Sequence, residues 1–140
     1  MEVGANQRVG ITASAFDLFH TGHVLMLHEA KQQCDFLIAA LQIDPSHERL
    51  DKNLPVQSIV ERYIQLDGCK YVDKIIPYAT EDDLLNILSA IKINVRIIGE
   101  EYKLKSFTGK GLYNIDTYYN RRNHNFSSTE LRERVHNESI

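Results

Sequence analysis

Two histidines that flank a Thr-Gly pair, at positions 20 and 23, are the residues of this chain best placed to do chemistry. They follow an apolar, β-branched run over 9–13 and open an amphipathic pattern over 21–33, which predicts a strand that leads into a helix. The free N–H groups of such a helix start favour a phosphate, through hydrogen bonds and the helix dipole. His20 and His23 would add donors, and Gly22 would let the backbone approach the anion.

The segment from Ala15 to His23, AFDLFHTGH, resembles the GTFDxxHxGH signature of the cytidylyltransferase-like nucleotidyltransferases. The resemblance implies a Rossmann-like enzyme that joins a nucleoside triphosphate to a phosphorylated small molecule. It is closest to glycerol-3-phosphate cytidylyltransferases, followed by the domains that activate heptose phosphates. It implies that the histidines are catalytic, contacting the nucleotide phosphates and stabilising the transition state, and that Asp17 helps to organise the nucleotide, although an Asx-type turn is compatible with Asp17 too. The nucleotide-binding residues implied here are Ser14, Ala15, Phe16, Asp17, His20, Gly22 and His23.

A second group of motifs lies in the last third of the chain. Arg122 and the segment 126–129 resemble the family's RTxGISTT signature, which implies that an arginine and a helix start hold the β- and γ-phosphates. The residue types favour that role, because arginine supplies paired donors and a helix start supplies free N–H groups, although Ser127 and Glu130 would also form a capping box. Gly99-Glu100-Glu101-Tyr102 stands where the family has GDDW or GGDY. The implied nucleotide contacts are Gly99, Glu100, Arg122, Ser127, Ser128 and Thr129, with Arg122 also catalytic.

Lys52 and Arg62 are the candidate ligands of the second substrate's phosphate. Arg49-Leu50-Asp51-Lys52, followed by Pro55-Val56, resembles the RLKG…PV loop of the heptose-phosphate branch, which implies that Lys52 reaches a phosphate. The related families also have an arginine near position 62 that holds substrate or orders the loop. A solvated charge cluster is the alternative interpretation of the lysine.

The chemistry implied is direct transfer of a nucleotidyl group. The chain has no Gly-x-Ser-x-Gly nucleophile and no Walker phosphate loop, and direct transfer needs neither, because the acceptor phosphate attacks the α-phosphorus in line and expels pyrophosphate. The protein would act by positioning and by neutralising charge. Mg²⁺ would accompany the triphosphate, with no metal-ligating side chain expected. CTP and a phosphorylated polyol such as glycerol 3-phosphate are the favoured substrates.

Other interpretations stay open. The first is adenylyl transfer to a sugar phosphate of the heptose-phosphate type. A second is a catalytically inactive relative that only binds a nucleotide, since Ser14-Ala15 and Glu100-Glu101 depart from the family signatures. A third is a flavodoxin-like interaction domain with structural histidines. A zinc site formed by His20, His23 and His28 would need convergent ligands that the spacing does not favour.

Hydrophobic periodicity and turn signals place these motifs on an α/β, Rossmann-like fold. We expect an open, mostly parallel five-stranded sheet with helices on both faces. The polar segment 44–54 would follow the second strand, at the carboxyl edge where ligands of such sheets bind. Strands are expected over 9–13, 36–43, 71–77, 95–99 and 113–119, and helices over 21–33, 80–91, 127–135 and from Pro55 to Leu66. The last of these helices would have an apolar face formed by Val56, Ile59, Val60, Tyr63, Ile64 and Leu66.

Composition is ordinary for a soluble globular protein. The chain has 140 residues, 43% of them hydrophobic and 25% charged, and a formal net charge of −3. We expect one nucleotidyltransferase domain over 1–140. The charge argues against a nucleic-acid partner, and no apolar run is long enough for a membrane span or a signal peptide. Cys34 and Cys69 form no CxxC pair, and the sequence therefore predicts a cytoplasmic protein with reduced thiols. Homodimerisation is expected from the family resemblance.

Overall fold

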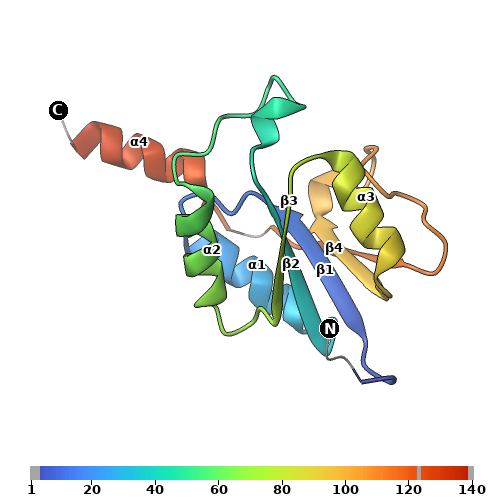
Figure 1. Ribbon diagram of the computed structural model, residues 1–140. Helices are drawn as coiled ribbons and strands as arrows, with labels where there is room; N and C mark the ends of the chain where they lie inside the picture. Colours follow the sequence, from blue (N-terminus) through green and yellow to red (C-terminus); the bar gives the residue numbers. More distant parts are fainter. Residues whose placement is uncertain (1–3, 123, 139–140) are drawn as a thin grey trace.

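A parallel five-stranded sheet forms the centre of the computed structural model, which describes residues 4–122 and 124–138 (Figure 1). The strand order is β3-β2-β1-β4-β5, and every pairing is parallel. The prediction of a Rossmann-like α/β fold is therefore confirmed. The strands are β1 (Val9–Ser14), β2 (Phe36–Gln42), β3 (Lys74–Tyr78), β4 (Val95–Gly99) and β5 (Asp116–Asn120), and the α-helices are α1 (Thr21–Lys31), α2 (Ile59–Asp67), α3 (Glu81–Ala90) and α4 (Ser128–Glu138).

The sheet is buried on both faces, as the apolar run of β2 predicts. Leu37, Ala39 and Leu41 pack in one core cluster with Leu27 of α1 and Leu66 of α2. The alternate residues of β2 pack in a second cluster with α3, which lies on the opposite side of the sheet from α1 and α2 (Figure 1). Because side chains of a strand alternate between its faces, one continuous apolar segment serves both layers.

The start of α2 differs from the sequence prediction. The helix begins at Ile59, with Ser58 as its N-cap and Glu61 completing a capping box, and not at Pro55. The backbone N–H groups of residues 56 and 57 donate to the carboxylate of Asp17, so this segment is held outside the helix. The expected apolar face is confirmed only in part: Leu66 is buried and Ile59 packs against the core, but Arg62 takes the other buried position on the helix. The apolar side chains left exposed are Val56, Val60, Tyr63 and Ile64.

The other element boundaries shift by a few residues. β5 begins at Asp116, because Gly109, Gly111 and Asn114 have positive φ values that turn the chain before the strand. β3 runs over Lys74–Tyr78, after a turn in which Val72 N donates to Cys69 O. The helices expected over 80–91 and 127–135 are present as α3 and α4.

The order in which strands are added to the sheet reverses at β1 and β4, although all strands stay parallel. The chain runs from β1 outward to β2 and β3, then returns to lay β4 on the other side of β1. Ligands of open α/β sheets bind at the carboxyl ends of the strands beside such a reversal. α4 extends away from the body of the molecule (Figure 1) and has no buried residue among those described. In the described ranges, no helix combines the length and apolarity needed to cross a membrane.

Candidate active site

A cavity of about 310 Å³ lies at the carboxyl ends of β1, β4 and β5, beside the N-terminus of α1. It occupies the edge of the sheet where the strand order reverses, which is the expected ligand position for this fold. We call it the first cavity. The predicted nucleotide-binding residues that line it are Ser14, His20, Gly22, His23, Gly99, Arg122, Ser127 and Ser128.

The N-terminus of α1 holds both histidines in place. Nδ1 of His20 accepts a hydrogen bond from Gly22 N at 2.9 Å, and Nδ1 of His23 accepts one from His20 N at 3.1 Å. The two side chains thus form a reciprocal capping box around the start of the helix. Because Nδ1 is the acceptor in each ring, a neutral ring carries its proton on Nε2. Each histidine therefore offers an Nε2–H donor for an anion.

Burial keeps both imidazoles neutral near pH 7. The pKa of His23 is lowered to about 4, chiefly by burial and then by the nearby His20 ring, while Asp17 opposes the change. Desolvation, then His124 and Arg122, lowers the pKa of His20 as well. The ring centroids are 4.0 Å apart, so charge on one ring disfavours charge on the other. A bound anion would raise both pKa values, and the pair is therefore suited to respond to negative charge on a ligand.

Gly22 is required by packing inside the motif. A Cβ atom at this position would lie 2.7 Å from Cε1 of His20 and 3.0 Å from the carbonyl oxygen of Phe126. The first distance is shorter than real Cβ contacts, and the second is at their lower limit. The glycine therefore lets the His20 ring and the segment before α4 approach the helix start together.

Arg122 and the start of α4 form another wall of the first cavity. The Arg122 side chain is 55% exposed, and its Nη1 lies 4.0 Å from Oε1 of Glu101, so the guanidinium is loosely paired and open to a phosphate. Glu100, a predicted nucleotide contact, accepts a hydrogen bond from Arg122 N at 3.2 Å and does not line the cavity. Ser127 Oγ caps α4 by accepting from Glu130 N at 3.1 Å. Thr129 is exposed and lies outside the cavity lining.

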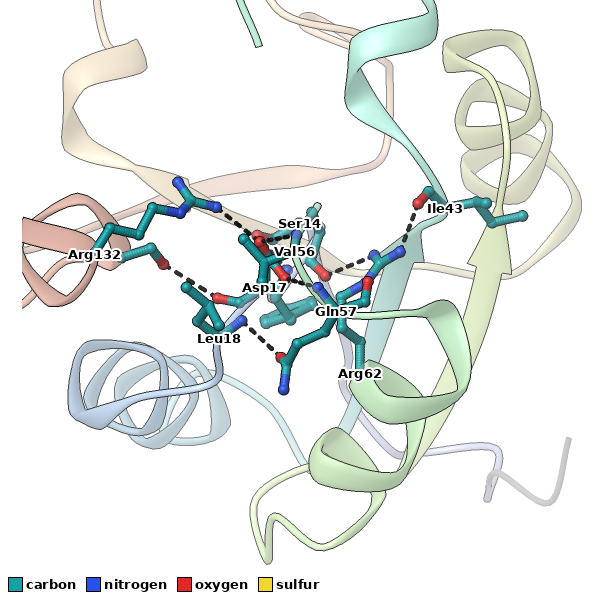
Figure 2. Close-up of polar contacts among 11 residues, drawn as sticks. Ser14, Asp17, Leu18, Ile43, Val56, Gln57, Arg62 and Arg132 are labelled. Carbon is teal, nitrogen blue, oxygen red and sulfur yellow. Dashed lines mark hydrogen bonds and ion pairs between the residues drawn. The ribbon is translucent and has the colours of Figure 1, made fainter. Parts of the chain in front are cut away.

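Asp17 connects three parts of the protein and does not line the first cavity (Figure 2). Its carboxylate, 10% exposed, accepts hydrogen bonds from Val56 N at 2.8 Å, Gln57 N at 3.0 Å and Arg132 Nη2 at 2.8 Å. Its carbonyl oxygen accepts from Ser128 Oγ at 3.1 Å. Asp17 therefore ties the β1–α1 connection to the segment before α2 and to α4. This geometry makes it a positioning residue.

The residues just before Asp17 form the turn out of β1. Phe16 is 1% exposed and belongs to the core, and both Phe16 and Leu18 have φ values of 51°. Non-glycine residues seldom adopt this left-handed conformation, so the turn depends on the contacts around it. Ala15 lines the second cavity described below, and Phe16 lines neither. The predicted nucleotide-binding segment thus divides into lining residues and residues that shape the turn.

Arg62 binds backbone carbonyl groups. The side chain is buried, and it donates to Gln57 O at 3.2 Å, Ala15 O at 3.0 Å, Gln42 O at 2.7 Å and Ile43 O at 2.6 Å. These acceptors lie after β1, at the end of β2 and before α2 (Figure 2). Arg62 lines neither cavity. Its contacts hold the loops at the edge of the sheet, and they leave little of the guanidinium for a substrate.

A second cavity of about 240 Å³ adjoins the first. The two cavities share Ala13, Ser14, Ile98 and Tyr102 as lining residues, so they meet at the ends of β1 and β4. The polar side chains around the second cavity include Lys52, which was predicted from the sequence. The others are Gln42, Arg49, Tyr78, Glu81, Arg96, Tyr102 and Thr108.

Several lining residues were not predicted from the sequence. Asn120, at the end of β5, lines the first cavity, and its Oδ1 is the buried side-chain polar atom without a hydrogen-bond partner among the described residues. His124 lies in the same lining, close enough to lower the pKa of His20. His28, the third histidine of the zinc alternative, stacks on Tyr71 and lies outside this lining. A polar residue directly after two tyrosines, at the end of an expected strand, was the available signal for Asn120.

The cytidylyltransferase-like family model matches residues 11–134 of this chain. Among curated proteins, the bifunctional protein HldE of Paramagnetospirillum magneticum is 36% identical over 107 residues, which cover 76% of this chain and 22% of that protein. The bifunctional protein HldE of Acidiphilium cryptum is 37% identical over 103 residues, covering 73% of this chain and 21% of that protein. This chain thus spans about a fifth of the length of these relatives.

Solved structures show the same fold at lower identity. A lipopolysaccharide core biosynthesis protein from Thermoplasma volcanium superposes with a TM-score of 0.60 at 21% identity, covering 96% of this chain and 90% of that one. A bifunctional NMN adenylyltransferase/ADP ribose pyrophosphatase from Francisella tularensis gives a TM-score of 0.63 at 19% identity, covering 94% of this chain and 42% of that one.

Proposed function

This chain belongs to the cytidylyltransferase-like family, and from that premise we propose that it transfers a nucleotidyl group from a nucleoside triphosphate to a phosphorylated small molecule. The observation that carries the proposal is the pair of adjoining cavities at the ends of β1 and β4. One holds two neutral histidine donors, an exposed arginine and a helix start, which suit a triphosphate. The other holds Arg49, Lys52 and Arg96, which suit an anionic acceptor.

In the proposed reaction, an oxygen of the acceptor phosphate attacks the α-phosphorus beside Ser14 and Ile98, which line both cavities. A new phosphorus–oxygen bond forms as the bond to the β-phosphate oxygen breaks, and pyrophosphate leaves. The Nε2–H groups of His20 and His23 would donate to the α-phosphate as negative charge builds on it. Arg122 and the start of α4 would hold the departing pyrophosphate.

A magnesium ion would neutralise part of the triphosphate charge. Within the described part of the chain, no group of three or more His, Cys, Asp or Glu side chains is arranged to hold a metal ion. We propose that Mg²⁺ would enter with the nucleotide and supply charge neutralisation. His20, His23 and Arg122 would bind phosphate oxygens of the nucleotide.

For the substrates, two choices follow from the resemblance. Cytidylyl transfer to glycerol 3-phosphate was the first expectation, and adenylyl transfer to a sugar phosphate was the alternative. The alternative is now better supported, because the loop over 49–56 resembles the heptose-phosphate branch and the relatives named HldE match about three quarters of this chain. We propose ATP and a sugar phosphate as the preferred pair.

The test is pyrophosphate release with Mg²⁺, each of the four ribonucleoside triphosphates and a panel of phosphorylated polyols and sugars. The proposal predicts release that requires one nucleotide and one acceptor together, and that is lost in a variant carrying His20→Ala and His23→Ala. His28→Ala is the matched control, since His28 lies outside the first cavity. Tight binding of a nucleotide without release in any combination would support the inactive, nucleotide-binding relative instead.

A further inference from the structure

Two buried arginines in this protein have very different surroundings. Arg62 is 2% exposed and Arg96 is 7% exposed. Arg62 donates to four backbone carbonyl groups, as described above. Arg96, the second residue of β4, donates only from Nη1 to Thr108 O among the described residues, and its guanidinium lies 5.0 Å from the centroid of the Phe107 ring. A guanidinium has five N–H donors, so most of those of Arg96 are left without a protein acceptor.

Arg96 also lacks a counter-ion. Within residues 4–122 and 124–138, no carboxylate lies within ion-pair distance of its guanidinium. Burial lowers the pKa of Arg96, yet an arginine stays charged in proteins. A buried charge without a partner is strongly unfavourable. The fold therefore keeps, at the second position of β4, a largely buried cation without an ion-pair partner, on which Tyr78 and Glu81 act only at longer range.

Arg96 faces the second cavity. Its neighbours on β4, Val95 and Ile97, belong to the core cluster on the α1 and α2 side, so the Arg96 side chain lies on the α3 face. The loop after β4 packs over the Arg96 side chain. Gly109 of this loop has a φ of 81°, and a Cβ atom added there would lie 3.1 Å from Arg96 Nη1. The Arg96 donors without a protein acceptor are therefore accessible from the second cavity, where a ligand can reach them.

The charges around the second cavity do not balance. Arg49 pairs with Glu81 at 3.3 Å, and these two charges cancel. Lys52 and Arg96 have no carboxylate partner among the described residues, which leaves an excess of two positive charges. A phosphate monoester carries a charge of about −1.5 to −2 at neutral pH. The cavity therefore matches a phosphate monoester in charge as well as in position.

We propose that Arg96 is an acceptor-binding residue that makes the second cavity selective for a phosphate monoester. The proposal rests on the proposed function, because it assigns the acceptor of that reaction to the second cavity. Arg96 would donate to the acceptor phosphate from the floor of the cavity, and Lys52 would approach it from the loop above. The phosphate would then lie next to Ser14 and Ile98, which line both cavities.

Arg96→Met tests the proposal, because methionine keeps most of the side-chain length and removes the charge. A largely buried charge without an ion-pair partner destabilises the unliganded protein. We therefore expect the melting temperature of the unliganded variant to equal or exceed that of the wild type. Affinity for inorganic phosphate and for a panel of phosphate monoesters, measured by calorimetry without nucleotide, should fall about 10- to 100-fold, as expected for hydrogen bonds to a charged group. Arg96→Lys should lose less, and Arg8→Met is the control at an exposed arginine that pairs with Asp116.

Nucleotide affinity separates this proposal from the proposed function. We expect Arg96→Met to bind ATP or CTP as the wild type does, since Arg96 does not line the first cavity. A variant that melts several degrees lower and binds phosphate monoesters normally would overturn the proposal and make Arg96 structural. Wild-type protein that binds none of the phosphate probes would overturn it too. Loss of pyrophosphate release in every wild-type reaction, with phosphate binding that still depends on Arg96, would instead reject the proposed function alone.

Discussion

Replacing Asp17 with asparagine distinguishes a positioning role from a nucleotide contact. Asparagine keeps the shape of the side chain, but its NH₂ group must face one of the donors that the carboxylate now accepts from. One part-buried backbone N–H then loses its acceptor, which costs about 1–3 kcal/mol. Loss of the pair with Arg132, whose side chain is 32% exposed, adds about 1 kcal/mol after allowance for solvent screening. We therefore expect Asp17→Asn to lower the free energy of unfolding by about 3 kcal/mol.

Urea denaturation at neutral pH measures this change, with Arg132→Met as the matched control. That control leaves both backbone hydrogen bonds of Asp17 intact and should cost only about 1 kcal/mol. Well below its melting temperature, the Asp17→Asn protein should still bind nucleotide, weakened through the displaced segment at 56–57 and the start of α4. A loss of less than 1 kcal/mol together with abolished nucleotide binding would refute the reasoning, because it would make Asp17 a direct ligand of the nucleotide.

Three further predictions concern His23, Arg62 and Lys52. The pKa of His23 is lowered from 6.5 to about 4 in the folded protein, so between these pH values the unfolded chain binds a proton that the folded protein does not. The free energy of unfolding should therefore fall as the pH drops from 6.5 to about 4. His23→Gln should make the urea midpoint less dependent on pH in this range. Arg62→Met should lower the free energy of unfolding by about 3–5 kcal/mol, since it frees four carbonyl groups, and an unchanged melting curve would contradict the structural role. Lys52→Met should leave the melting temperature unchanged and raise the KM for the acceptor but not for the nucleotide, because Lys52 lines the second cavity. Equal effects on both KM values would argue against a role of Lys52 in binding the acceptor.

Local signals in the sequence predicted the framework well. The apolar run that forms β2 can only be buried on both faces, and the Thr80 capping box marks the start of α3 directly. The start of α2 was missed because Pro55 was taken as the first helical residue, although Ser58 and Glu61 form a local capping box. What the sequence does not show is that Asp17, 39 residues before Val56, holds the preceding segment outside the helix. The buried position of Arg62 was also missed, because its acceptors come from three separate segments.

The residues of the candidate site show the same difference between local signals and long-range contacts. His20, His23, Arg122 and the start of α4 meet because their motifs sit at strand and helix ends that the fold brings together. Arg96 was overlooked because one charge inside an apolar strand says nothing about a cavity until the loop over 100–111 is placed on it. Side-chain roles that depend on long-range neighbours therefore needed the structure.

³¹P NMR of a complete reaction shows whether the protein joins a nucleotide to a phosphorylated acceptor. We expect equal amounts of pyrophosphate and of a new product with two coupled phosphorus signals, formed by wild-type protein with Mg²⁺ and absent with the His20→Ala, His23→Ala variant. Inorganic phosphate or a nucleoside diphosphate in place of that product, or the same product from the double variant, would rule out the proposed transfer at this site.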